Sequence, residues 1–93
     1  MFEFPDDACW NEQEDAVEFS IRLGDYAAKV FLPRRALQSI VGARPRPEEC
    51  IVYFHLNRTE IERVAEDKVS ARQLDDDANI RITSRDLRAF RPS

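Results

Sequence analysis

Residues 17–32 read VEFSIRLGDYAAKVFL, and this stretch decides the fold. Apolar and polar residues alternate strictly over 17–23, which is typical of a strand with one buried face. Gly24-Asp25 can then form a two-residue loop, with glycine in the first position that a type II′ turn prefers. A slip of one residue would mix the two faces, so the sequence predicts a β-hairpin over about 16–32 in a single register. Its inward pairs are all apolar: Leu23 with Tyr26, Ile21 with Ala28, Phe19 with Val30, and Val17 with Leu32.

A short helix at about 33–41 is predicted to follow the hairpin. Pro33 suits the first turn of a helix, where its missing N–H costs nothing. Ala36, Leu37, Ile40 and Val41 recur at helical spacing, and Gly42 is a natural residue to end the helix.

A longer helix is predicted at about 47–70, after the stiff connector Arg44-Pro45-Arg46-Pro47. Most of its apolar residues fall on one side of a helical wheel. Val52 and Leu56 fall outside that stripe, so they either cover the short helix or belong to a surface for a partner.

Arg58 falls inside the apolar stripe of the longer helix. An unpaired buried charge costs several kcal/mol by order of magnitude, so Arg58 must either extend its charged end to solvent or find an acidic partner. A structural ion pair is the favoured interpretation, and a clamp for a ligand anion is the alternative. Glu62 lies one turn along, and Asp86 lies in the C-terminal segment. We therefore expect Arg58 to be substantially buried, to pair with Glu62 or Asp86, and to join the long helix to the C-terminal segment.

The last part of the chain predicts a strand at about 79–83, with Ile80 and Ile82 inward, and a short C-terminal helix with Asp86 near its N-terminus. Phe2-Glu3-Phe4 is the candidate for a further strand. The fold class expected is therefore α+β. A three- or four-stranded, mainly antiparallel sheet has one face covered by the two helices, in a single domain over 1–93.

Charge and composition exclude several classes of protein. The net charge of 93 residues is −4, which makes general affinity for nucleic acid unlikely. The longest uncharged stretches, 36–43 and 50–57, are far below the roughly 20 residues that span a bilayer. The N-terminus is acidic, unlike a secretory signal. We expect a cytoplasmic protein with no membrane segment.

No catalytic or cofactor motif is present. Two glycines cannot build a glycine-rich phosphate loop, and His55 is the only imidazole. Cys9 and Cys50, without a CxxC pair, cannot assemble a four-ligand zinc site. We expect no catalytic residue, no cofactor and no metal; Cys50 should be a buried apolar residue, and both thiols should stay reduced in the cytoplasm.

The sequence offers one weak binding candidate, the four arginines that bracket the short helix: Arg34, Arg35, Arg44 and Arg46. Guanidinium groups this close in sequence could bind phosphates or an acidic partner. No aromatic residue interleaves them, so base stacking is unsupported, and a solvated basic face is the favoured interpretation.

Several segments together resemble the small bacterial family known as domain of unknown function 1488, and the likeness runs from about residue 2 to 87. It is carried by Phe-Pro-Asp at 4–6, the strand at 17–19, the segment 33–37, the long-helix residues Phe54, Arg58, Ile61, Ala65 and Lys68, and the segment 82–87. The chain departs from the family at Val69, where an aromatic residue is expected. The resemblance implies a small α+β protein and brings no activity or catalytic residue; Arg58 and Asp86 match its polar pattern.

The function expected is that of a non-enzymatic accessory or protein-interaction domain that binds a protein partner or forms a homodimer. Val52, Leu56 and the alternating blocks of charge favour it. Nucleic-acid or anion binding through the arginines at 34–46 is the alternative, and an enzyme of unknown type comes third.

Overall fold

The computed structural model describes residues 1–89, which contain four strands and four helices. In chain order these are β1 (Cys9–Asn11), β2 (Ala16–Leu23), β3 (Tyr26–Pro33), α1 (Arg34–Val41), α2 (Pro47–Leu56), α3 (Arg58–Ser70), β4 (Ile80–Arg81) and α4 (Ser84–Ala89). The sheet order is β1-β2-β3-β4; the first three strands are antiparallel, and β4 runs parallel to β3. The predicted α+β class with a mainly antiparallel sheet is confirmed.

The hairpin of β2 and β3 has the predicted register. Val17 lies opposite Leu32, Phe19 opposite Val30 and Ile21 opposite Ala28. Gly24 has a φ of 60°, as the first position of a type II′ turn requires. Leu23 was expected to be buried and is instead exposed, because it is the last residue before the turn.

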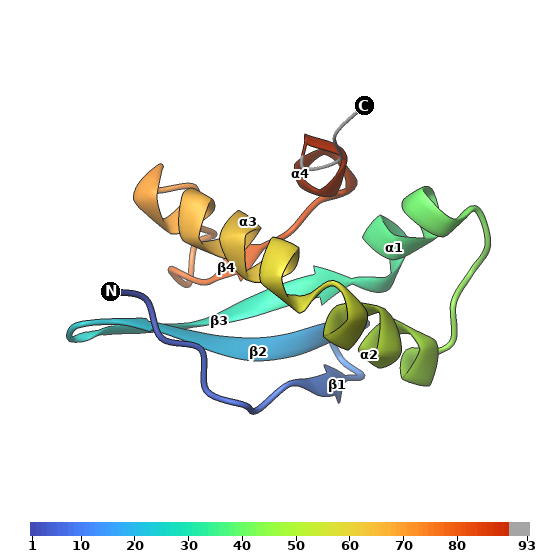
Figure 1. The fold of residues 1–93 in the computed structure, drawn as a ribbon, viewed down its shortest axis with the longest axis horizontal. Coiled ribbons are helices and arrows are strands. Elements are labelled where there is room, and N and C mark those ends of the chain that lie inside the picture. The colour runs from blue at the N-terminus through green and yellow to red at the C-terminus, as the bar shows by residue number, and fades with distance from the viewer. Residues whose placement is uncertain (90–93) are drawn as a thin grey trace.

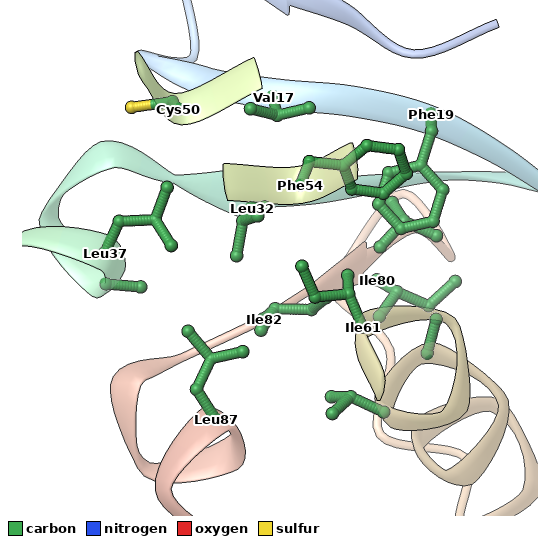
Figure 2. Packing of buried hydrophobic residues seen from close by; sticks show 14 of the residues in the cluster. Val17, Phe19, Leu32, Leu37, Cys50, Phe54, Ile61, Ile80, Ile82 and Leu87 are labelled. Atoms are coloured by element: carbon green, nitrogen blue, oxygen red, sulfur yellow. The ribbon is translucent and has the colours of Figure 1, made fainter. Parts of the chain in front are cut away.

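The core lies between one face of the sheet and the helices (Figure 1). The rings of Phe19 in β2 and Phe54 in α2 meet at its centre, with their centroids 4.7 Å apart (Figure 2). Cys50 is fully buried near the same end of the sheet as Val17, as its place on the apolar side of the helix predicted. Every helix contributes at least one buried residue to this single cluster.

The predicted long helix at 47–70 is two helices, α2 and α3, separated by Asn57. Asn57 has a φ of −120° and a ψ of 25°, outside the helical region, and its side-chain amide donates to the carbonyl of Tyr53. An asparagine side chain competes in this way for backbone groups and favours a break. A single helical wheel drawn through 47–70 therefore does not describe both halves.

The N-terminal segment follows the outer edge of β2 but pairs with it differently from the expectation. Phe2-Glu3-Phe4 forms no strand; only Glu3 makes a bridge, to Arg22. The edge strand is β1, whose Cys9 lies opposite Glu18. Between the two pairings, Asp7 accepts a hydrogen bond from the backbone N–H of Ser20.

The C-terminal segment matches its prediction closely. Ile80 and Ile82 are buried, although β4 itself ends at Arg81. Thr83 caps α4, since its hydroxyl accepts from the N–H of Asp86 and the Asp86 carboxylate accepts from the N–H of Thr83. Residues 90–93 of the predicted domain lie outside the described residues.

Candidate functional site

The four candidate arginines do not form one cluster. Arg34 pairs with Asp15, with Nη2 3.1 Å from Oδ1, and its guanidinium lies 5.1 Å from the centre of the Trp10 ring. Arg46 pairs with Glu48 and Glu49 at the start of α2. Acidic groups therefore already compensate two of the four charges.

Arg35 and Arg44 have no ion pair or hydrogen bond to any side chain within residues 1–89, and they line separate cavities. Arg35 borders a cavity of about 360 Å³ between the start of α1 and the end of β4, together with Arg81. Arg81 there is paired with Glu14 and Asp75. The structure thus leaves two single arginines in different places where the sequence suggested a group of four.

Arg44 lies at a groove of about 300 Å³ between α1 and α2. Leu37, Val41, Ala43, Pro45 and Tyr53 make the groove largely apolar, and Arg44 and Glu49 are the charged residues that line it. The loop between the two helices forms its end, and it begins at Gly42, whose N–H donates to the carbonyl of Gln38 and closes the last turn of α1.

The outer side of α2 continues the apolar surface away from the groove. Glu49, Val52, Tyr53 and Leu56 stand at positions i, i+3, i+4 and i+7 of α2, so they form one stripe along the helix. Val52 is 55% exposed and Leu56 is 78% exposed. Neither residue covers α1, which excludes one of the two interpretations of their position. We call the groove together with this stripe the α1–α2 face.

Arg58 is less buried than expected and has partly different partners. Its side chain is 33% exposed; Nε lies 2.7 Å from Glu62, as predicted, and Nη1 lies 3.2 Å from Asp6. The hydrogen bond to Glu62 raises the pKa of Arg58. The expected role of joining the long helix to the C-terminal segment is wrong, because the guanidinium passes over the Phe54 ring toward the N-terminal segment. Of the two partners considered, the structure gives Glu62 and not Asp86.

Asp86 instead pairs with Lys68, at 2.7 Å, and both side chains are more buried than that of Arg58. Burial acts to raise the pKa of Asp86, but hydrogen bonds from Lys68 and Thr83 outweigh it and lower that pKa below its usual value. The sequence signal for this pair was Lys68 itself, which stands beside Val64, Ala65 and Val69 on the side of α3 that faces the protein.

A polar cluster of Asp7, Ser20 and Lys29 lies on the face of the sheet that the helices do not cover. The Ser20 hydroxyl lies 2.5 Å from the Asp7 carboxylate and accepts from Lys29 Nζ at 3.3 Å. Burial acts to raise the pKa of Asp7, but hydrogen bonds from Ser20 and the charge of Lys29 lower it overall. A carboxylate with a lowered pKa is a weak base, so this cluster suits holding the N-terminal segment on β2 better than activating a serine.

Neither the cysteines nor His55 contributes to the Lys68–Asp86 pair or to the cluster of Asp7, Ser20 and Lys29. Both thiols are free; Cys9 is exposed and Cys50 is buried, and burial raises the pKa of the Cys50 thiol. His55 is exposed, with its ring edge-on to Phe54. Among residues 1–89, no three His, Cys, Asp or Glu side chains converge as metal ligands, and no helix combines the length and apolar character that crossing a bilayer requires.

Comparison with known proteins shows the family to which the chain belongs. The family model described as a protein of unknown function, DUF1488, matches residues 2–82. The chain belongs to the DUF1488 family. The crystal structure of a DUF1488 protein of unknown function from Shewanella loihica PV-4 has the same fold, with a TM-score of 0.78 at 18% identity over 87% of this chain and 90% of that one. No curated protein matches this DUF1488 chain.

Proposed function

We propose that this DUF1488 chain is a non-enzymatic, cytoplasmic accessory domain that binds another protein through the α1–α2 face. The observation that carries the proposal is the exposure of Val52 and Leu56 in the middle and at the end of a helix whose opposite side fills the core. Single exposed aliphatic residues are ordinary, but here they adjoin an apolar groove. A continuous apolar surface of this kind is characteristic of an interaction site.

The net charge favours a foreign partner over a homodimer, because two copies of the chain, each with a net charge of −4, repel one another. The exposed large aliphatic residues of the α1–α2 face are Val41, Val52 and Leu56. Three such side chains supply only part of the roughly 800 Å² that each partner buries in a standard stable interface, so a partner of either kind has to cover further surface.

The alternative, nucleic-acid or anion binding through the arginines at 34–46, has less support. Ion pairs hold Arg34 and Arg46, and Arg35 and Arg44 border different cavities. A row of phosphates favours guanidinium groups that lie together and are uncompensated. An enzyme has the least support, because the Ser20 cluster offers only a weak base.

Photo-crosslinking in cells tests the proposal. A photoreactive amino acid is placed at position 52, and a matched control carries it at position 23, since Leu23 is also an exposed aliphatic residue but lies at the far end of the hairpin. We expect a discrete product with a second protein from position 52 alone, weakened several-fold by Leu56→Ser. Equal products from both positions, or none, contradict the proposal.

Two further outcomes separate the competing interpretations. A product that joins two copies of the chain replaces the foreign partner with a homodimer. Retention on a polyanion column that falls steeply with salt, and that Arg35→Ala and Arg44→Ala abolish, favours the anion-binding alternative.

A further inference from the structure

The groove between α1 and α2 has the size and surface for a partner's side chain. Its volume of about 300 Å³ lies at the lower end of the range of ligand pockets, about 300–1,000 Å³. Leu37 is buried in it, and Val41, Pro45 and Tyr53 add apolar surface around it. A bulky aliphatic or aromatic side chain is the group that such a surface selects.

The two charged residues of the groove are not equivalent. Glu49 is already engaged, because its carboxylate accepts from both the backbone N–H and the Nε of Arg46. Those hydrogen bonds lower the pKa of Glu49 and keep it ionised in the capping of α2. Arg44 has no acidic partner among residues 1–89, so of the two charged side chains that line the groove it is the one free to pair with a ligand. Arg46 is shared between Glu48 and Glu49, so the four charges at this end of α2 sum to zero.

The backbone presents Arg44 in a restricted conformation. Pro45 follows it, and a residue before proline is confined to extended conformations. Gly42, with a φ of 80°, ends α1 two residues earlier. Ordering this segment on binding therefore costs less entropy than ordering a flexible loop.

The exposed stripe on α2 determines how long the partner segment is. From Glu49 to Leu56 the helix rises about 10 Å, which is two turns. A ligand that covers both the groove and Leu56 has to be a chain segment, since one side chain cannot reach both.

We infer, on the basis of the proposed function, that the α1–α2 face binds a short acidic amphipathic segment of another protein. A bulky apolar side chain of that segment enters the groove, an adjacent carboxylate pairs with Arg44, and a second apolar residue packs on Val52 and Leu56. The unpaired Arg44 is the local feature that favours a carboxylate at this position of the segment, against the net charge of −4 of the whole chain.

Selection from random peptides displayed on phage tests this inference. Pools are selected on the wild-type chain, on Leu56→Ser, on Arg44→Glu and on Arg35→Glu. Arg35→Glu is the matched control, because it changes the net charge equally but at the other cavity. Circular dichroism confirms that each variant is folded before selection.

We expect the wild-type pool to be enriched in Asp and Glu next to Leu, Phe or Trp, and Leu56→Ser to retain few of these peptides. Arg44→Glu should weaken a selected peptide about tenfold or more, equivalent to about 1.4 kcal/mol, and should shift the selected pool toward Lys and Arg. Arg35→Glu should change neither the affinity of the selected peptide nor the composition of the selected pool.

Failure of the inferred ligand chemistry can be distinguished from failure of the proposed function. Peptides that depend on Leu56 but show no acidic excess, or that respond equally to Arg44→Glu and Arg35→Glu, overturn the inferred chemistry and leave the α1–α2 face as a binding site. A wild-type pool no richer than that of Leu56→Ser contradicts the proposed function itself.

Discussion

Within residues 1–89, two ion pairs join α3 to other elements, one near each end, and they differ in exposure. Arg58, at the start of α3, is 33% exposed and reaches Asp6, whose side chain is 83% exposed. Lys68, near the end, is 14% exposed, and its partner Asp86 is 20% exposed. The arginine that stands out in the sequence thus makes the more solvated contact, and an inconspicuous lysine makes the more buried one. Position in an apolar stripe is a poor guide to burial for a long side chain that can run along the surface.

Removing Lys68, the lysine of the less exposed pair, should have the largest effect. Lys68→Met leaves the Asp86 carboxylate partly buried without its cation, and we expect the free energy of unfolding to fall by about 2 kcal/mol. Urea denaturation measures this loss. Lys68→Met combined with Asp86→Asn should cost less than the sum of the two single variants, because they share one interaction. If Lys68→Met lowers the free energy of unfolding by no more than the experimental error, the Lys68–Asp86 pair does not stabilise the protein more than the Arg58–Asp6 pair.

The Lys68–Asp86 pair should also make stability sensitive to acid. The folded-state pKa of Asp86 lies below its usual value of 3.8, so the carboxylate contributes stability above that value and loses it as the pH falls through the lower folded pKa. We expect the urea midpoint to drop between about pH 5 and pH 2. Asp86→Asn, less stable at pH 7, should show a smaller drop over the same range. An equal drop in both proteins would assign the acid sensitivity to other carboxylates.

How well a feature could be predicted from the sequence depended on how close its residues lie along the chain. The hairpin register could be predicted because alternation and Gly24 agree and both act between neighbours. The position of Val52 and Leu56 outside the apolar stripe could be predicted from their angle on the helix, but their exposure was one of two open alternatives, because burial under the short helix would also fit that angle. The break at Asn57 could not, because the residues on both sides of it have helical character.

Contacts between distant segments were harder to predict. Asp6 meets Arg58 across 52 residues of sequence, and nothing in either local pattern selects the other. The same holds for Arg35 and Arg44. They line two separate cavities because α1 packs against both α2 and α4, and this packing cannot be read from the local sequence. The α1–α2 face was therefore visible only as two unexplained apolar residues.

Removing the more exposed cation of α3 should have a smaller effect than removing Lys68. Arg58→Met keeps an apolar stem over Phe54 and loses the contacts to Glu62 and Asp6, and we expect a loss of about 1 kcal/mol. Amide exchange in residues 1–8 should become faster, since Arg58 also donates to the carbonyl of Phe4. If Arg58→Met lowers the free energy of unfolding more than Lys68→Met does, the more exposed pair is the more stabilising one.

Neutralising Asp6 should have the smallest effect of the series. Asp6→Asn removes an exposed charge from a pair that water and salt already screen, so we expect a change within about 0.5 kcal/mol. The same urea titration measures it. A loss near that of Arg58→Met would mean that Asp6, rather than Glu62, is the partner that matters for Arg58.

The parallel pairing of β4 with β3 has a consequence for the order of folding. Val30 and Ile80 are neighbours in the sheet but lie 50 residues apart in the chain, whereas the β2–β3 hairpin closes over two residues. Closing the longer loop costs about 3.5 kcal/mol of chain entropy by the (3/2)RT ln n relation. β4 gains few backbone contacts in return, because it is two residues long. The hairpin and the helices that pack on it should therefore form the folding nucleus, and β4 should join after the transition state, so that substitutions at Ile80 accelerate unfolding and leave the folding rate almost unchanged.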